Sequence, residues 1–245
     1  MIPFITLFGE KLFLYPFMMG AAWGVGYHIS KSLNQKYHVF KNFNWIFLGI
    51  FISSWLGSKL FYLLSVDTNA KTSIAQNTNF WLGGGFVFYG GLIGGIIFIA
   101  LMTWKFKVDI GDFSIFIPSI LLGHAIGRIG CFLAGCCYGV ELEHEYFFSH
   151  YLHGAERFPV QLLEAIALVI GGWYFLRRFQ IRSFEYVMNY FFFYALVRFM
   201  TELWRGDSFR GIWFDLISTS QIIAAVFVFV FLFWKVKTLN KISNR

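Results

Sequence analysis

The chain has 245 residues, of which 58% are hydrophobic and 13% are charged. Soluble domains average roughly 45–50% apolar and about 25% charged residues, so this composition argues against a soluble enzyme. Phenylalanine occurs 33 times and the mean hydropathy is +0.61, which also excludes disordered, collagen-like and disulfide-rich secreted chains. The sequence therefore predicts an integral membrane protein, and its formal net charge of +7 must be explained on that background.

Apolar stretches near the roughly 20 residues that cross a bilayer recur along the whole chain. The first stretch is too long for a removed signal peptide and lacks a small-residue cleavage site. The fourth contains polar residues and several glycines, so a broken or partly re-entrant helix is an open alternative there. Together the stretches predict an all-α integral membrane protein of about seven transmembrane helices, at approximately 12–30, 44–64, 85–105, 112–138, 160–177, 184–204 and 215–235.

We interpret the chain as a single polytopic membrane domain over 1–245, with outer loops near 65–84, 139–159 and 205–214. Basic residues concentrate in alternate loops, and such residues favour the cytoplasmic side. This predicts an external N-terminus, a cytoplasmic C-terminus and a multi-pass protein of the bacterial inner membrane. The net positive charge then reflects topology and requires no nucleic-acid partner. Twelve of the 20 basic residues lie on the predicted cytoplasmic side: Lys31, Lys36, Lys41, Lys105, Lys107, Arg177, Arg178, Arg182, Lys235, Lys237, Lys241 and Arg245.

Small residues recur at four-residue spacing within the predicted helices. Such pairs let helix backbones approach closely, so helix packing is the first explanation. The alternative is that the missing side chains admit a lipid headgroup to the backbone. The pairs are Gly20/Gly24, Gly90/Gly94, Gly91/Gly95, Gly123/Gly127 and Gly135/Gly139.

Several ionisable residues lie inside the predicted helices, where each costs roughly 2.5–3.5 kcal/mol on insertion scales. Arg198 and Glu202 are four residues apart, so they share a helix face and can form a salt bridge, which could be purely structural. Arg128 and Arg205 are interpreted as having no carboxylate at helical spacing. With Arg157 and Arg198 they fall toward the outer half of the membrane. Guanidinium groups there suit an anionic phosphodiester headgroup, which they bind through paired hydrogen bonds.

Two residues one helical turn from these arginines are candidate catalytic groups. Tyr194 precedes Arg198 by four residues, so its hydroxyl can reach the same pocket. His124 precedes Arg128 by four residues, and a histidine beside a phosphate-binding arginine suits a general base. The alternative for His124 is a structural hydrogen bond between helices.

The three cysteines are Cys131, Cys136 and Cys137, and no CxxC motif is present. A disulfide between the adjacent Cys136 and Cys137 would be strained, and Cys131 with His124 lacks the ligand spacing of a metal site. We therefore interpret the cysteines as small buried apolar residues. No metal and no cofactor are predicted.

Five sequence motifs occur in order along the chain. They are Tyr89-Gly-Gly-Leu-Ile-Gly94, Gly127-Arg-Ile-Gly-Cys-Phe-Leu-Ala-Gly-Cys-Cys-Tyr-Gly139, Arg157-Phe-Pro-Val-Gln-Leu-Leu-Glu164, Tyr194-Ala-Leu-Val-Arg198-Phe-Met-Thr-Glu202-Leu-Trp-Arg205 and Ile217-Ser-Thr-Ser-Gln221. Any one of them is weak evidence, but five in order on seven predicted helices are specific. With these motifs the chain resembles the bacterial prolipoprotein diacylglyceryl transferases nearly from end to end.

The resemblance implies transfer of the diacylglyceryl group of phosphatidylglycerol to the lipobox cysteine thiol of a preprolipoprotein, with release of glycerol phosphate. The implied partners are therefore this lipid and preprolipoprotein signal peptides. By position, Arg128 matches the family's signature arginine, and Arg198 and Tyr194 match its essential pair in the sixth helix. Including the residue-based candidates, the predicted catalytic residues are Arg128, Arg198, Tyr194, His124 and Tyr89. The predicted substrate-binding residues are Tyr15, Gly90, Gly91, Gly94, Gly139, Gln161, Glu164, Glu202 and Arg205.

The chain departs from the family pattern at three positions. Tyr89 stands where the family has a histidine that acts as a base, and Cys131 and Cys136 stand where it has Asn and Glu. We hypothesise that His124 supplies the missing base and that Tyr89 hydrogen-bonds the lipid. Two alternatives stay open: a related transferase using the same lipid with a different acceptor, and a non-catalytic phospholipid-binding membrane protein.

Overall fold

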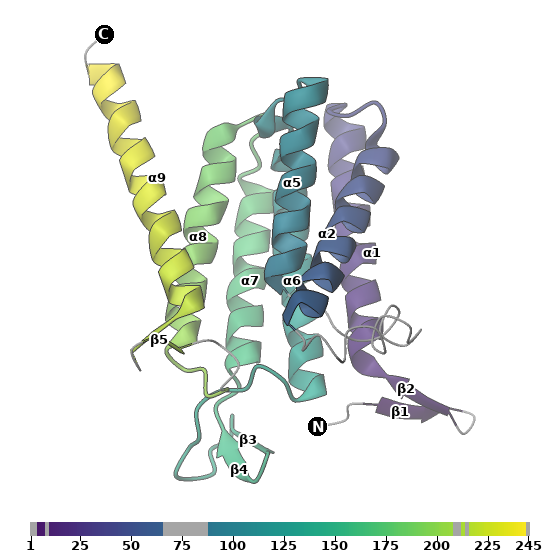
Figure 1. The fold of residues 1–245 in the computed structure, drawn as a ribbon, viewed down its shortest axis with the longest axis vertical. Coiled ribbons are helices and arrows are strands. Elements are labelled where there is room, and N and C mark those ends of the chain that lie inside the picture. The colour runs from purple at the N-terminus through teal and green to yellow at the C-terminus, as the bar shows by residue number, and fades with distance from the viewer. Residues whose placement is uncertain (1–3, 8–9, 66–87, 208–211, 214–215, 244–245) are drawn as a thin grey trace. The chain divides into compact units, whose positions relative to one another are not determined.

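The computed structural model describes residues 4–7, 10–65, 88–207, 212–213 and 216–243. The predicted outer loop 65–84 therefore lies almost wholly outside the described residues, and the loop 205–214 partly so. Within the described ranges, seven long helices follow the predicted apolar stretches in order (Figure 1). They are α1 (Leu14–Tyr37), α2 (Phe43–Ser65), α5 (Phe88–Phe106), α6 (Ile117–Ala134), α7 (Val160–Arg177), α8 (Phe184–Glu202) and α9 (Thr219–Ser243).

Among the residues that the structure describes, four helical segments are long and apolar enough to cross a membrane, which confirms a mainly helical membrane protein. Seven spans, and the positions of the termini, stay predictions. The four segments are Phe43–Leu64, Ile110–Ala134, Val160–Arg177 and Thr219–Thr238.

The fourth predicted stretch is divided between a 3-10 helix, η1 (Ile110–Phe116), and α6. Pro118 lies in the first turn of α6, where its missing N–H leaves no hydrogen bond unmade. The helix then continues through its internal glycines and ends at Gly135, whose φ of 71° is a left-handed C-cap. The alternative of a broken helix is thus correct only at the junction of η1 with α6.

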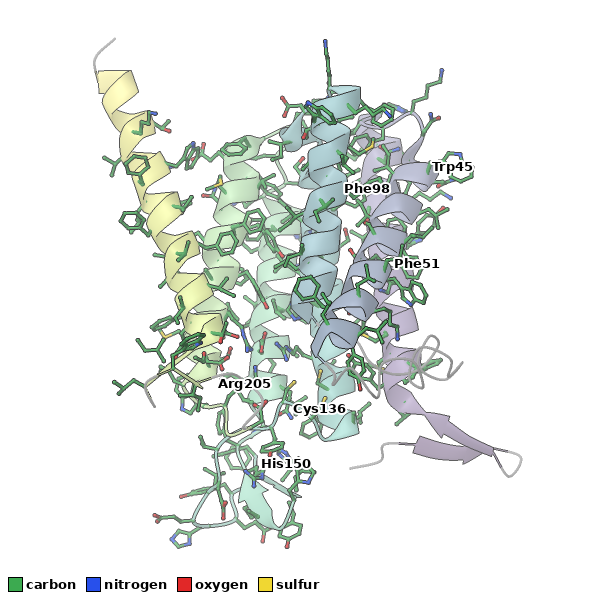
Figure 2. All side chains as sticks on the ribbon, viewed as in Figure 1. Trp45, Phe51, Phe98, Cys136, His150 and Arg205 are labelled. Atoms are coloured by element: carbon green, nitrogen blue, oxygen red, sulfur yellow. The ribbon has the colours of Figure 1, made fainter. Side chains whose placement is uncertain are left out.

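The chain forms two compact units, one of residues 31–112 and the other of residues 1–30 with 113–245. The prediction of a single domain over 1–245 stays a prediction. The first of these units is built on α2 and α5. A Cβ atom added at Gly90 would lie 2.4 Å from the carbonyl oxygen of Gly57, so the two helix backbones touch there. Trp45, which is 73% exposed, points away from this helix pair (Figure 2).

The second unit packs α6 against α1, α7 and α8, and α9 against α8. Ser30 Oγ of α1 lies 2.9 Å from Ser119 Oγ of α6, and the Phe192 and Phe231 rings of α8 and α9 stack 4.4 Å apart. The core consists of Ile117, Leu121, Ala125, Leu168, Phe175, Tyr186 and Val187. This core fixes the relative positions of α6, α7 and α8, which carry the polar residues described below.

In the part of the chain that the structure describes, three short antiparallel strand pairs, which the sequence did not predict, also belong to the second unit. β1 (Phe4–Leu7) pairs with β2 (Glu10–Phe13), β3 (His150–Leu152) with β4 (Ala155–Arg157), and β5 (Ile212–Trp213) with β6 (Ile217–Ser218). The β3–β4 hairpin lies in the predicted outer loop 139–159. Its two turn residues, His153 and Gly154, both have positive φ, as a type I′ turn requires.

Candidate active site

Six charged side chains form one buried group, which we call the arginine–carboxylate cluster. None of them is more than 11% exposed, and their formal charges cancel. Among apolar helices, such pairing is what makes buried charge tolerable. Its members are Arg128 of α6, Glu164 of α7, Arg198 and Glu202 of α8, and Arg205 and Asp207 just after α8. Figure 2 shows Arg205 at the end of this unit that also carries Cys136.

Glu164 connects three helices within the cluster. Its Oε1 lies 3.0 Å from Arg128 Nη2, and its Oε2 lies 3.3 Å from Arg198 Nη1. Arg198 Nη2 is also 2.5 Å from Glu202 and donates to Ser220 Oγ of α9 at 3.1 Å. The predicted salt bridge between Arg198 and Glu202 is therefore confirmed, and Arg198 is held from α7, α8 and α9 together.

The prediction that Arg128 and Arg205 lack carboxylate partners at helical spacing is wrong for Arg205. Its Nη1 lies 3.5 Å from Glu202, three residues earlier, and its Nε and Nη2 donate to Asp207 at 2.8 and 2.5 Å. Asp207 was missed because it follows the predicted helix. Arg128 finds its partner on a different helix, which no spacing along one helix reveals.

Two buried polar atoms at this site that belong to no carboxylate have no hydrogen-bond partner among the residues that the structure describes. They are Arg128 Nε and Gln161 Oε1, and both are buried. The other end of the Gln161 amide is occupied, since Nε2 donates to the Cys136 carbonyl oxygen at 2.8 Å. A buried polar group without a partner costs about 1–3 kcal/mol, so these atoms mark places that a ligand can complete.

His124 and Tyr194 lie together beside the cluster. Their ring centroids are 5.3 Å apart with an interplanar angle of 51°. His124 is also within electrostatic reach of Arg128, Glu164 and Arg198. The structure thus brings the candidate base and the candidate tyrosine to the same place as the two arginines that they precede in sequence.

Arg157, which the sequence grouped with the outer arginines, has other partners. Its guanidinium lies 4.5 Å from the centre of the Tyr138 ring, and its Nη1 donates to the Gly139 carbonyl oxygen at 3.4 Å. Its Nη2 is 4.0 Å from the exposed carboxylate of Glu141. Arg157 therefore fastens β4 to the segment that follows α6.

The predicted glycines of α5 lie in the other compact unit. A Cβ at Gly94 would lie 2.2 Å from the Ser53 carbonyl oxygen, and one at Gly91 would lie 3.3 Å from that of Ser54. With Gly90, these residues pack against α2, as the helix-packing alternative predicts. Tyr89 is in the first turn of α5, but its side chain lies outside the described residues. A role of these four residues in binding or catalysis stays a prediction.

Gly139 and Tyr15 lie in the same unit as the cluster. A Cβ at Gly139 would be 2.2 Å from the Phe158 carbonyl oxygen, so glycine is required there for the close approach of two backbone segments. Tyr15 lies beside Gly130 of α6 and is within electrostatic reach of Arg128. Substrate binding by Gly139 and Tyr15 stays a prediction.

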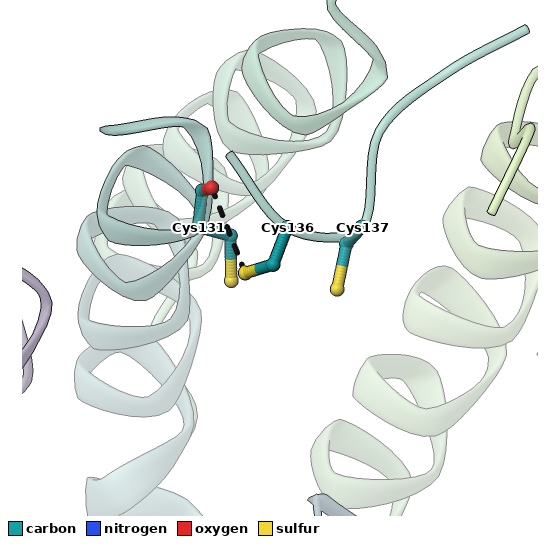
Figure 3. Close-up of side chains that lie close together, drawn as sticks. All are labelled: Cys131, Cys136 and Cys137. Atoms are coloured by element: carbon teal, nitrogen blue, oxygen red, sulfur yellow. Dashed lines mark hydrogen bonds between the residues drawn. The ribbon is translucent and has the colours of Figure 1, made fainter. Parts of the chain in front are cut away.

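The three cysteines gather where α6 ends (Figure 3). Cys136 is exposed and Cys131 and Cys137 are half-buried, so their interpretation as small buried apolar residues is wrong. The physical reason is the helix end at Gly135, which leaves Cys136 and Cys137 in a turn. Hydrogen bonds from the Cys131 and Cys136 side chains lower the pKa of the Cys137 thiol, and the nearby guanidinium charges lower it further.

The fold and the site together define a helical membrane protein with an internal, charge-balanced polar site. The chain belongs to the prolipoprotein diacylglyceryl transferase family, whose model matches residues 3–236. This confirms the family that the five motifs predicted.

Two relatives align over almost the whole chain. The phosphatidylglycerol–prolipoprotein diacylglyceryl transferase 2 of Clostridium perfringens (strain 13 / Type A) is 31% identical over 238 residues, covering 91% of this chain and 90% of the relative. The phosphatidylglycerol–prolipoprotein diacylglyceryl transferase of Clostridium tetani (strain Massachusetts / E88) is 32% identical over 244 residues, covering 93% of each.

Proposed function

We propose that this protein transfers the diacylglyceryl group of phosphatidylglycerol to the lipobox cysteine of a preprolipoprotein, forming a thioether and releasing glycerol phosphate. Family membership and the names of the two clostridial relatives support this activity. Within the structure, the supporting observation is Arg128, whose buried guanidinium is tied to Glu164 while its Nε has no partner among the described residues. Such a donor can bind an oxygen of a phosphodiester in apolar surroundings.

The proposed location is the bacterial inner membrane, with all seven long helices spanning it as one domain. The N-terminus lies outside and the C-terminus in the cytoplasm, because the basic residues concentrate at the predicted cytoplasmic ends. In this orientation the arginine–carboxylate cluster lies in the outer half of the membrane.

In the proposed reaction, the acceptor sulfur attacks the carbon of the diacylglyceryl group that is bonded to a phosphate oxygen. The carbon–oxygen bond breaks, and glycerol phosphate leaves with the electron pair. Arg128 and Arg198 bind the phosphate and stabilise its developing charge, while Glu164 orients both guanidinium groups. Donors that are already positioned in a site of low dielectric stabilise such a charge strongly. Tyr15, Gln161, Glu202 and Arg205 complete the lipid-binding pocket.

His124 is the proposed base that takes the proton from the acceptor thiol, with Tyr194 beside it and Tyr89 hydrogen-bonding the lipid. We expect His124→Ala to lower transferase turnover by about 10²-fold, because general-base catalysis contributes roughly 10²–10⁴-fold. The measurement is the rate of peptide lipidation per folded protein. His144→Ala, which changes an exposed histidine outside the site, is the matched control. Full activity of folded His124→Ala would refute this assignment.

The decisive experiment incubates the purified protein with phosphatidylglycerol vesicles and a lipobox peptide. The expected products are glycerol phosphate and a thioether-lipidated peptide in equal amounts. A peptide with serine in place of the cysteine, and vesicles of phosphatidylethanolamine alone, should give neither product. Lipid turnover that needs a different acceptor would favour the related transferase. Lipid binding without turnover would favour the non-catalytic binding protein.

A further inference from the structure

The turn that follows α6 brings the thiols of Cys136 and Cys137 close to the thiol of Cys131. Gly135 is left-handed, the Cys136 N–H donates to the Cys131 carbonyl oxygen at 3.1 Å, and Cys137 is left-handed with φ 55°. A non-glycine residue in that region is uncommon and persists where its surroundings hold it there. The chain therefore turns back immediately after the helix, which places Cys136 and Cys137 beside Cys131 (Figure 3).

Contacts from outside the turn hold its backbone in place. Gln161 of α7 donates from Nε2 to the Cys136 carbonyl oxygen at 2.8 Å, and His153 Nε2 lies 3.3 Å from the Gly135 carbonyl oxygen. Neither contact uses a sulfur atom. The positions of the thiols are therefore set by the surrounding backbone. The Cys136 thiol also donates a hydrogen bond to the Cys131 carbonyl oxygen at 3.6 Å, which a bound metal ion would replace.

The three sulfur atoms all lie within 4.8 Å of one another, and the three cysteines form no disulfide. Three thiolates bound to one Zn²⁺ at about 2.3 Å would be about 3.8 Å apart in tetrahedral geometry. To reach that separation, no pair of sulfur atoms has to move closer by more than about 1 Å. In the described part of the chain, this is the one group of three metal-ligating side chains that converges in this way.

We propose that Cys131, Cys136 and Cys137 form a three-thiolate site for a soft, thiophilic metal ion of the Zn²⁺ class. Thiolate sulfur selects such ions over hard cations. Three protein ligands leave a fourth position for water or another ligand. Three thiolates around a divalent ion carry a net charge of −1, and Arg128 and Arg205 lie within electrostatic reach of Cys137 to balance it.

The site would anchor the helix end that carries Arg128. Cys131 follows Arg128 by three residues on the same face of α6, about 4.5 Å further along the helix axis. A metal that bridges Cys131 to the turn would restrain this last turn of α6. This inference concerns metal binding alone and does not depend on the proposed transferase activity.

The test measures Zn²⁺ binding by the full-length protein in detergent, after reduction and treatment with a chelator. We expect one equivalent of Zn²⁺ in competition with a chromophoric chelator, and thiolate-to-metal charge-transfer bands when Co²⁺ replaces it. Cys131→Ser, Cys136→Ser and Cys137→Ser should each weaken binding by at least about 10–100-fold, the loss that even residues supporting the ligands produce. His144→Ala is the matched control and should bind like the unchanged protein.

Three results would overturn the proposal: binding that survives the cysteine substitutions, no bound equivalent in the unchanged protein, or a disulfide between two of the thiols in protein isolated under argon. If the serine variants fail to fold, alkylating all three thiols in the unchanged protein should abolish binding. Zn²⁺ should also raise the unfolding temperature of the unchanged protein and of His144→Ala, since a ligand stabilises the state that binds it. The Zn²⁺ measurement needs neither phosphatidylglycerol nor an acceptor peptide, so failure of the transferase proposal is distinguishable from failure of this one.

Discussion

Two helix contacts in this protein bring membrane helices together by opposite means. Between α2 and α5, Gly57 and Gly90 let the backbones touch, and the space between the helices is filled by the protein itself. Among α6, α7 and α8, Glu164 joins Arg128 and Arg198 through charge, and the Arg128 Nε is left without a partner in the described residues. The glycine motif therefore accounts for helix packing, whereas the charged contact retains an unused capacity to bind.

The largest expected effect tests the charged contact directly. Arg128→Ala should lower transferase kcat/KM by about 10²–10³-fold, the loss seen when one donor to a developing negative charge is removed. The measurement is lipidation of a lipobox peptide per folded protein. Arg177→Ala is the matched control, because Arg177 is exposed at the end of α7 and lies over the Trp173 ring. Equal losses of kcat/KM in the two variants would show that the charged contact has no particular role in the reaction.

The second effect concerns stability. Glu164→Gln should destabilise the protein by about 3 kcal/mol, because it leaves the buried Arg128 without its counter-charge. The measurement is unfolding in detergent. Glu185→Gln is the control, since it breaks the ion pair between Glu185, whose side chain is 51% exposed, and Lys235, whose side chain is 40% exposed. That change should cost less than about 1 kcal/mol. A similar loss in the free energy of unfolding for both variants would show that burial does not increase the contribution of the Glu164 ion pairs to stability.

The helices were predictable, because hydrocarbon thickness fixes the length of an apolar stretch. The hairpins were not, since β3 and β4 are three residues each and depend on the positive φ of His153 and Gly154. An alternating pattern of apolar residues that is only three residues long cannot be distinguished from a polar loop.

The site was predictable only where its contacts follow helix geometry. Four-residue spacing places Arg198 beside Glu202 on α8. The same spacing places His124 on the same face of α6 as Arg128. The Arg128–Glu164 pair depends on how α6 packs against α7, which spacing along one helix does not contain. The prediction that the cysteines are buried was wrong for a related reason, because their burial depends on where α6 ends.

The third prediction tests the uncharged contact. Gly94→Ala should destabilise the protein by about 1–3 kcal/mol, because its Cβ would lie 2.2 Å from the backbone oxygen of Ser53. Gly24→Ala is the control, since a Cβ there would meet nothing within 4 Å. The measurement is thermal unfolding together with KM for phosphatidylglycerol. If Gly94→Ala instead raised KM at unchanged stability, the alternative of a headgroup-binding glycine would be supported and the comparison would fail.

The smallest effect asks whether the charged region acts beyond its helices. The pKa of the Cys137 thiol lies below its ordinary value, chiefly through its hydrogen bond with Cys131, with Arg128 and Arg205 adding to the shift. A lowered pKa means that the thiolate persists as the pH falls below the usual cysteine value of about 8.5. In metal-free protein, the rate of Cys137 alkylation by iodoacetamide should therefore fall by less from pH 8.5 to pH 6.5 than the rate for an ordinary thiol, which loses about 50-fold over the same interval. Peptide mass spectrometry gives the rate at each pH. Cys131→Ser should move the profile toward that of the ordinary thiol. A loss of about 50-fold in the unchanged protein would show that neither the Cys131 hydrogen bond nor the two guanidinium groups lower the pKa of this thiol.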